Sequence, residues 1–277
     1  MRAGPLIVLA LAGLAVAALG VSDVGGIAAP ARPSAALAEL ERTVAPRRDV
    51  IHRTTAIIGR SAEGRPIEAT AVNGGARDDR DSGPRVVAIG CIHGDECAGI
   101  AAVRHAWVRR AYFCRRPEAG DLIVVRNLNP DGLALGTRVN GRGVDLNRNF
   151  ASDWRPIGAR GDPEHSGPAP FSEPETRIAR RLIRRLRPEV TIWFHQQAEP
   201  LVRAWGPSVP AARVYARLAG LPFHRLPWMD GTAPDWQNHR FRGTSSFVVE
   251  LPTAGPVHAN RHAAAILALA GELTRGP

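Results

Sequence analysis

Apolar and polar positions change period repeatedly along the chain after about Ile51, and this pattern predicts strands that alternate with helices. Short apolar runs bounded by turn residues indicate buried strands, and longer stretches with apolar residues three or four apart indicate helices. We expect strands at Thr54–Ile58, Ile67–Val72, Arg85–Gly90, Leu122–Leu128, Thr191–His195 and Ser246–Leu251. We expect helices at Cys97–Arg110, Glu173–Leu186, Pro210–Ala219 and Ala259–Leu273.

The helix expected at Glu173–Leu186 has the clearest boundaries. Ser172 is expected to cap its start, and Glu175, three residues on, completes the pattern of a capping box. Pro188 is expected to end it. Four apolar side chains fall on one helical face: Ile178, Leu182, Ile183 and Leu186.

Continuous apolar strands between helices predict a sheet covered by helices on both faces. We therefore expect one α/β domain over residues 47–277, with a mixed, mostly parallel sheet. Loops at Gly74–Pro84 and Pro156–Pro170 are expected to be surface insertions. Such sheets bind ligands beyond the carboxyl ends of their strands. Four polar residues lie at or just after those ends: His93, Asn129, His195 and Glu250.

The N-terminal segment has the pattern of an export signal. A short cationic start, an apolar run at Pro5–Val21 and small residues before Pro30 describe a secretory signal. The run is close to the shortest that spans a bilayer, so an uncleaved anchor stays open. We assign residues 1–30 to a signal peptide or anchor, and residues 31–46 to a linker or a short first helix. The expected location is secreted or extracytoplasmic.

Charge changes this picture little. The formal net charge is +10, and the basic residues other than histidine are all arginine. The arginines are scattered or lie along helix faces without an aromatic platform, which argues against nucleic-acid binding. Peripheral association with an anionic cell envelope is a milder inference from the same charge. Examples on one helix face are Arg180, Arg181, Arg184 and Arg185.

Three cysteines allow one internal disulfide, which export would permit. Cys91 and Cys97 flank a His-x-x-Glu motif, and Cys114 follows further along. Metal ligation by the two flanking thiols is disfavoured, because a structural thiolate site needs four soft ligands close together. A catalytic cysteine is less common than a buried structural one. The pattern does not decide which two cysteines pair.

The candidate chemistry is that of a metal site. His93 and Glu96 lie three apart after one strand, and His195 ends another, so they form a set of two imidazoles and one carboxylate. With one coordination position open to water, this is the ligand count of a catalytic zinc. Each residue alone is more often structural. Glu250, at the end of a further strand, could pair with an arginine or act as a general base on a zinc-bound water.

Two polar turns lie between these strand ends. Asn129-Pro130-Asp131-Gly132 is a strong turn signal, and it is followed by the segment Gly143-Val144-Asp145-Leu146-Asn147-Arg148-Asn149-Phe150. Arginines in turns usually meet solvent, but near a zinc they would hold a substrate carboxylate or an oxyanion.

In this order, the motifs HGDE, NPDG and GVDLNRNF, a strand-end histidine and a strand-end glutamate resemble the zinc carboxypeptidases of the M14 type. The resemblance runs from about Arg85 to Pro252. Gly136-Thr137-Arg138 and the SEPET segment at Ser172–Thr176 are similar to the murein peptide amidase branch. The resemblance implies a single-domain zinc-carboxypeptidase-like fold with one Zn²⁺ per chain.

The resemblance also implies roles for single residues. His93, Glu96 and His195 would bind zinc. Arg138 would polarise the scissile carbonyl and stabilise the oxyanion, and Glu250 would act as general base and then acid. Asn147 and Arg148 would grip the terminal carboxylate of the substrate. Apart from the resemblance, Asp145 is a candidate to orient a zinc-bound histidine, because such ligands need a hydrogen-bond partner on their second ring nitrogen.

The sequence departs from the family at two places. A mobile tyrosine of the digestive enzymes is absent from Leu226-Pro227-Trp228, so closure over substrate must differ. Pro234 stands beside Asp235-Trp236, where the family sets its side-chain preference, and it carries no charge.

We therefore expect an exported zinc metallopeptidase that cleaves beside a C-terminal, carboxylate-bearing residue. The preferred substrate is a cell-wall stem peptide of the γ-D-Glu-diaminopimelate type. Three alternatives stay open: a general metallocarboxypeptidase acting on proteins and peptides, a zinc N-acyl amino acid deacylase, and a wall-binding module without turnover.

Overall fold

The computed structural model describes residues 33–44, 52–73, 84–112, 120–197, 199–227 and 229–274. The predicted signal or anchor at residues 1–30, most of the predicted insertion at Gly74–Pro84, and Cys114 and Trp228 lie outside the described residues. Among the described residues, none of the helices combines the length and apolarity that a membrane crossing requires.

An eight-stranded mixed sheet runs through the molecule in the order β1-β2-β4-β3-β5-β8-β6-β7. The central strands β4, β3, β5 and β8 are parallel neighbours, whereas β2 pairs with β4, β1 with β2, and β6 with β8 in antiparallel fashion. This confirms the expected mostly parallel sheet. The strands are β1 Arg53–Arg60, β2 Pro66–Val72, β3 Val86–Ile89, β4 Leu122–Val125, β5 Val190–Gln197, β6 Leu201–Ala204, β7 Phe223–Arg225 and β8 Ser245–Pro252.

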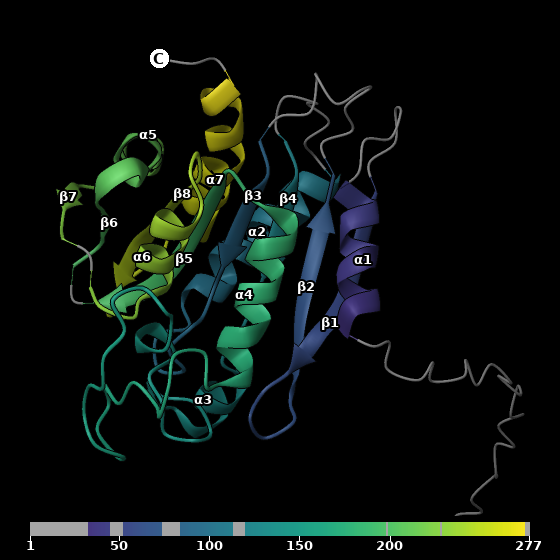
Figure 1. Cartoon of the computed structure of the whole chain (residues 1–277). Helices are drawn as coiled ribbons and strands as arrows, with labels where there is room; N and C mark the ends of the chain where they lie inside the picture. The colour runs from purple at the N-terminus through teal and green to yellow at the C-terminus, as the bar shows by residue number, and fades with distance from the viewer. Residues whose placement is uncertain are drawn as a thin grey trace, which may run out of the picture. The chain divides into compact units, whose positions relative to one another are not determined.

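Helices cover both faces of this sheet, as Figure 1 shows for α4 in front and α1 beside β1 and β2. One apolar core contains α2, α5 and α7, and the second contains α1, α4 and α6. The helices are α1 Pro33–Val44, α2 Gly99–Tyr112, α3 Pro130–Leu135, α4 Pro174–Leu186, α5 Val209–Ala219, α6 Ala233–Arg240 and α7 Ala259–Thr274. Two 3₁₀ turns are η2 Leu146–Arg148 and η3 Gly206–Ser208.

The central strands are apolar along their length because both of their faces are buried. In β3, Val86 and Ala88 join the core with α2, whereas Val87 and Ile89 join the core with α4. Successive side chains of a strand point to opposite faces, so a strand between two helical layers needs an apolar residue at every position.

Two local expectations are decided by the structure. Of the two alternatives for residues 31–46, the short first helix is found and the linker is wrong for Pro33–Val44, which is helix α1 with Leu37 and Leu40 in the core. The capping box at α4 is wrong. Glu173 is the N-cap residue and makes no side-chain cap bond, and the Glu175 carboxylate instead accepts hydrogen bonds from Ala62 N and Asn140 Nδ2.

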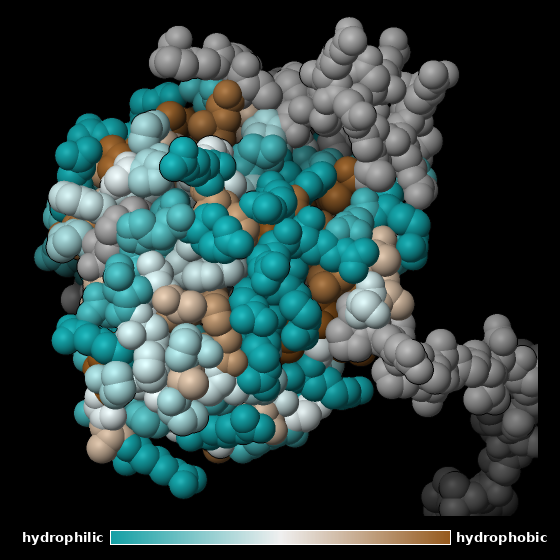
Figure 2. Space-filling model, viewed as in Figure 1, coloured by the Kyte–Doolittle hydropathy of each residue, from teal (hydrophilic) through white to brown (hydrophobic). Residues whose placement is uncertain are grey.

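Hydrophilic colouring runs over the face that α4 occupies, as a comparison of Figures 1 and 2 shows. Helix α4 exposes Arg181, Arg184 and Arg185 there. Arg180 lies over the Phe171 ring at 4.7 Å, and Arg185 pairs with Glu41. Two of these four charges, on Arg180 and Arg185, therefore have partners within the chain.

Candidate metal centre and active site

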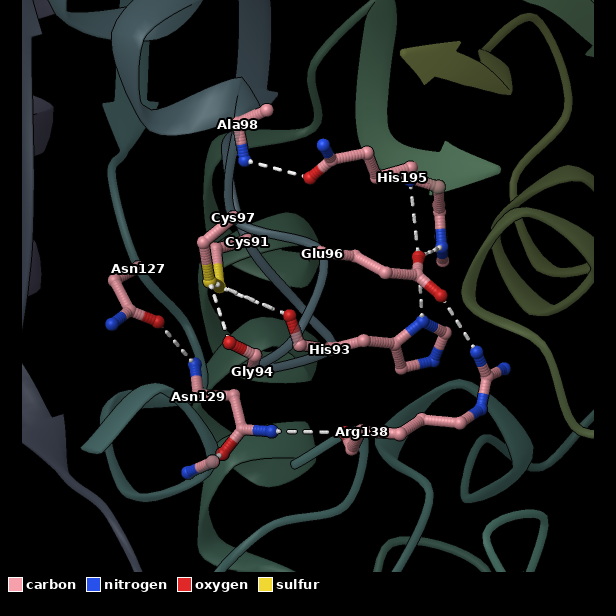
Figure 3. The surroundings of a disulfide bond; sticks show 12 residues. Cys91, His93, Gly94, Glu96, Cys97, Ala98, Asn127, Asn129, Arg138 and His195 are labelled. Carbon is pink, nitrogen blue, oxygen red and sulfur yellow. Dashed lines mark hydrogen bonds and ion pairs between the residues drawn. A yellow bond between two sulfur atoms is a disulfide. The ribbon is translucent and has the colours of Figure 1, made fainter. Parts of the chain in front are cut away.

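The loop after β3 carries the first two metal candidates and is fixed by close contacts. A Cys91–Cys97 disulfide closes the segment that contains His93 and Glu96 (Figure 3). Gly94 packs so tightly that a Cβ there would lie 1.9 Å from the carbonyl carbon of Gly132. Only glycine allows this approach, so the HGDE and NPDG motifs are held together by backbone contact.

Three side chains from two elements, the loop after β3 and strand β5, converge on one point. Glu96 Oε2 lies 3.1 Å from His93 Nδ1 and 3.0 Å from His195 Nδ1, and Figure 3 shows the carboxylate between the two rings. The rings are 4.7 Å apart between centroids and are both buried. His195 comes from β5, where it is paired in register with Glu250 of β8.

These atoms fit a zinc ion. Two ligands of a tetrahedral zinc with bonds near 2.1 Å lie about 3.4 Å apart, close to the spacings in this cluster. Two imidazole nitrogens and a carboxylate oxygen are the donor set of a catalytic zinc. His93, Glu96 and His195 are therefore the residues that could hold the metal.

A ring of partners orients the three donors. His93 Nε2 lies 2.9 Å from Asp145 Oδ1, which leaves Nδ1 directed at the cluster and confirms the expected contact of Asp145 with a metal histidine. Arg138 donates from Nη1 to Glu96 Oε1 at 2.8 Å and from Nε to Asp145 Oδ2 at 3.0 Å. Asn147 Nδ2 lies 3.5 Å from His195 Nε2.

The electrostatics favour ionised carboxylates. Burial alone would raise the pKa of Glu96, but hydrogen bonds from His195 and His93 hold it well below its usual range. Burial also acts on Asp145, and the neighbouring charges of His93 and Arg138 lower its pKa instead. Burial lowers the pKa of His195, which keeps its ring neutral, as metal ligation requires.

A cavity of about 460 Å³ opens beside the cluster and is lined by His93, Arg138 and His195. Glu250 lies on its wall with a side chain 3% exposed, and Arg203 Nη1 donates to Glu250 Oε1 at 2.9 Å. The second oxygen, Oε2, is buried and accepts no hydrogen bond from the described residues.

Arg148 lies on the wall of the same cavity. Its Nη2 donates to Glu164 Oε1 at 2.9 Å, and the Glu164 side chain is 54% exposed. Asn147 is fixed beside it, because its Oδ1 accepts from Ala233 N at 3.0 Å. The two residues of the GVDLNRNF motif thus present an amide and a guanidinium to one side of the cavity.

The irregular segment after this motif forms part of the cavity wall. Pro156–Pro170, expected as a surface insertion, contributes Pro163 and Glu164 to the lining. Buried Asn149 anchors the segment, since its Nδ2 donates to Ser166 O at 2.8 Å and to Ala169 O at 3.0 Å. The segment is mostly exposed, as expected of a surface insertion, and its inner side also lines the cavity.

Comparison with known proteins agrees with this arrangement. The model of the zinc carboxypeptidase family, peptidase M14, matches residues 47–242. Murein peptide amidase A of Vibrio campbellii is 30% identical over 211 residues, covering 68% of this chain and 78% of that protein. The chain belongs to the M14 zinc carboxypeptidase family. It is accordingly a metallocarboxypeptidase-like hydrolase of a zinc-dependent family, related to murein peptide amidase.

Other relatives agree over different lengths. Murein peptide amidase A of Escherichia coli K12 is 35% identical over 118 residues, which cover 37% of this chain and 45% of the relative. The match therefore spans less than half of that relative. The crystal structure of murein-tripeptide amidase from Escherichia coli O157 is 26% identical, with a TM-score of 0.57 and coverage of 86% and 95%. Carboxypeptidase A from Helicoverpa armigera shares the fold at 19% identity, with a TM-score of 0.66 and coverage of 86% and 71%.

The sequence prediction named the motif residues of this M14 site and missed two others. The structure brings together His93, Glu96, His195, Arg138, Asn147, Arg148 and Glu250 around one cavity or in direct contact with it. Arg203 and Glu164 were not predicted, since β6 was not predicted and neither residue belongs to a motif. A charged residue inside the short apolar run Leu201–Ala204 was the one available signal for Arg203.

The departures from the family also lie at the cavity. Leu226, Pro227 and Pro234 line it, so the wall that would set side-chain preference is uncharged at these positions. Among the described residues that line the cavity, none is a tyrosine.

Proposed function

We propose that this M14 hydrolase cleaves the amide bond before a C-terminal, carboxylate-bearing residue of cell-wall stem peptides, outside the cytoplasm. One observation carries the reaction type: a single cavity joins a two-histidine, one-glutamate cluster, a buried carboxylate oxygen without a protein partner, and an arginine–asparagine pair. For the carboxylate oxygen, the absence of a partner refers to the residues that the structure describes. These are the parts needed to activate water and to hold a chain end.

Glu250 is the proposed general base. Its Oε2 is buried, accepts no bond from the described residues and belongs to a side chain on the cavity wall, so it can accept a proton from an attacking water. As the carbon–nitrogen bond breaks, the same carboxyl group returns that proton to the leaving amine. Zinc held by His93, Glu96 and His195 would acidify water and polarise the carbonyl.

Arg138 is placed to stabilise the negative charge that develops on the carbonyl oxygen. It lines the cavity, and its side chain is 21% exposed. Its bonds to Glu96 and Asp145 fix the guanidinium before substrate arrives, which removes the cost of reorienting it during the reaction.

Asn147 and Arg148 are the proposed clamp for the terminal carboxylate. A guanidinium binds a carboxylate through two parallel N–H donors, and a neighbouring amide adds a third. The clamp restricts hydrolysis to the last residue of a chain, because the carboxylate must occupy it while the scissile bond reaches Glu250.

The choice of a cell-wall substrate rests on relatives and on expected location. Relatives named as murein peptide amidases match the chain in sequence, and one matches in structure above 25% identity. The apolar run at Pro5–Val21 supports export, and the Cys91–Cys97 disulfide suits an oxidising compartment. Peripheral association with an anionic envelope, from the net charge of +10, stays a prediction.

A general carboxypeptidase is the second candidate. Leu226, Met229 and Pro234 give the cavity an apolar wall that an ordinary apolar side chain would fit.

The test is hydrolysis of L-Ala-γ-D-Glu-diaminopimelate beside peptides that end in Phe or Arg, each with and without a chelator. Chelator-sensitive release of diaminopimelate alone is the expected result. Cleavage of only the ordinary peptides would replace the cell-wall assignment with the general carboxypeptidase. If no substrate turns over while zinc is bound, the deacylase and the wall-binding module become the better hypotheses.

A further inference from the structure

Arg203 has no assigned part in the proposed hydrolysis, although its guanidinium lies in the same cavity. It comes from β6, and its side chain is 24% exposed. The proposed reaction uses Arg138 for the oxyanion and Arg148 for the terminal carboxylate. A third arginine in a cavity of about 460 Å³ therefore calls for a ligand of its own.

The sheet directs Arg203 toward the reacting end of the cavity. Strands β6 and β8 are antiparallel, with Arg203 opposite Val248. Directly opposed residues share a face of the sheet, and so do residues two apart on one strand, so Arg203, Val248 and Glu250 face the same side. All three line the cavity.

The Nη2 group of Arg203 makes only a weak contact within the protein. Nη1 donates to Glu250 Oε1, and Nη2 has a 3.8 Å contact with the sulfur of Met229. Thioether sulfur is a weak acceptor, and an arginine has five N–H donors. A carboxylate that reached Nη2 would replace a weak contact with a charge-assisted hydrogen bond.

Among the described residues, the part of the lining formed by Met229, Thr232 and Pro234 supplies no further cation. Pro234, where the family sets its side-chain preference, is uncharged, and its neighbours Thr232 and Met229 in the lining are also uncharged. The described lining residues include three arginines and two glutamates, so arginine outnumbers carboxylate. The side chain of a C-terminal residue held by Arg148 would thus meet positive charge at Arg203.

We propose that Arg203 is a specificity-determining residue that binds a second carboxylate, on the side chain of the substrate's C-terminal residue. The inference rests on the proposed function and deepens it. Diaminopimelate carries such a carboxylate, and lysine is the same residue without it. The site should therefore prefer diaminopimelate to lysine at the chain end.

The test compares L-Ala-γ-D-Glu-diaminopimelate with L-Ala-γ-D-Glu-L-Lys in the full-length, zinc-loaded protein and in Arg203→Met. A charged hydrogen bond corresponds to about 10- to 100-fold in kcat/KM, so the wild type should favour diaminopimelate by that factor. Arg203→Met should abolish the preference, and Arg203→Lys should keep part of it. The control is Arg213→Met, which removes an exposed arginine that stacks on Phe223 outside the cavity lining, and it should leave the ratio unchanged.

The ratio separates substrate recognition from support of Glu250. If Arg203→Met slows both peptides equally, Arg203 acts through Glu250 and the proposal is overturned. Calorimetric binding of free diaminopimelate and free lysine gives a readout that needs no turnover. Tighter binding of diaminopimelate that Arg203→Met abolishes would support the proposal even if neither peptide is hydrolysed, a result that would reject the proposed function alone. Equal binding of the two amino acids would overturn the proposal itself.

Discussion

The two ends of the cavity are built differently. The metal end consists of His93, Glu96, His195, Asp145 and Arg138, in which the three donors and Asp145 are buried and bonded to one another. The substrate end consists of Arg148, Glu164, Arg203 and Glu250. Here two separate ion pairs, Arg148–Glu164 and Arg203–Glu250, take the place of one connected cluster, and the Glu164 side chain is 54% exposed.

This difference separates chemistry from specificity. Buried charges at the metal end depend on their partners, since removing one leaves another unpaired in a dry environment. At the substrate end, Glu164 is mostly exposed, and an ion pair with an exposed partner contributes little to stability, so Glu164 can change without loss of the fold. We expect substitutions at the metal end to alter metal binding, and substitutions at the substrate end to alter the choice of substrate.

Glu250 links the two ends and should show the largest effect. Glu250→Gln keeps the shape of the side chain but cannot accept a proton, so kcat should fall by about 10²- to 10⁴-fold. Zinc content by elemental analysis and product binding by calorimetry should be unchanged. The matched control is Glu68→Gln, which breaks an exposed pair between Glu68 on β2 and Arg126, the residue after β4, several strands away from β8. Unaltered hydrolysis in Glu250→Gln would point to another base, whereas a wild type that binds the peptide without hydrolysing it would point to a binding module.

A buried pair between His262 and Tyr215 lies outside both ends of the cavity, in the apolar core that contains α2, α5 and α7. It provides a test that involves neither end. His262 Nδ1 lies 2.8 Å from Tyr215 Oη, and burial lowers the pKa of His262 to about 4. The unfolded chain takes up a proton near pH 6.5, whereas the folded chain does not until about pH 4. Stability should therefore fall as the pH drops through this window, by on the order of 2–3 kcal/mol.

Chemical denaturation between pH 4 and pH 7.5 measures this loss. His262→Gln should flatten the curve, and His224→Gln, which changes an exposed histidine on β7, should not. An unchanged slope in His262→Gln would assign the acid sensitivity to other groups.

Asp145 is not one of the proposed metal ligands. Substituting it therefore tests whether zinc binding depends on the charges that surround those ligands. Asp145→Asn removes the charge beside His93 Nε2 while an amide oxygen can still accept from Asn147 N, as Asp145 does at 2.8 Å. Loss of an orienting carboxylate typically weakens metal binding by about 10- to 100-fold. Competition with a chromophoric chelator measures the zinc affinity. If that affinity stays the same, the metal end does not depend on its surrounding charges as argued above.

The sequence predicted the metal end better than the substrate end for a physical reason. His93, Glu96 and His195 lie at strand ends, and the carboxyl ends of parallel strands meet at one edge of a sheet. Their position at strand ends therefore indicated the three donors, whereas Arg138 was predicted from the resemblance to the family and Asp145 from the need of a metal histidine for an orienting partner.

The substrate end depends on pairings that no local pattern reveals. Arg203 reaches Glu250 because β6 pairs antiparallel with β8, and a four-residue edge strand has too little periodicity to be predicted. Glu164 reaches Arg148 from an irregular segment that buried Asn149 holds in place. The prediction of a capping box at α4 was wrong for a related reason. The Glu175 carboxylate accepts hydrogen bonds from Ala62 N and Asn140 Nδ2, which lie in distant segments of the chain.

Substitution of Glu164 should have the smallest effect of these predictions, and it tests the comparison between the two ends of the cavity most directly. Its carboxylate occupies the Arg148 guanidinium that we assign to the substrate carboxylate, so the two carboxylates compete for one partner. Glu164→Gln should free Arg148 and lower KM by about two- to fivefold, because an exposed pair contributes only ~0.2–1 kcal/mol. The value of kcat should not change, since the competition affects binding alone. Initial rates for L-Ala-γ-D-Glu-diaminopimelate measure both constants, and Glu68→Gln again controls for the lost charge.

A higher KM would mean that Glu164 contacts the substrate directly, as it could through the ammonium group of diaminopimelate. The substrate end would then recognise both charges of that residue, with Arg203 on its carboxylate and Glu164 on its amine.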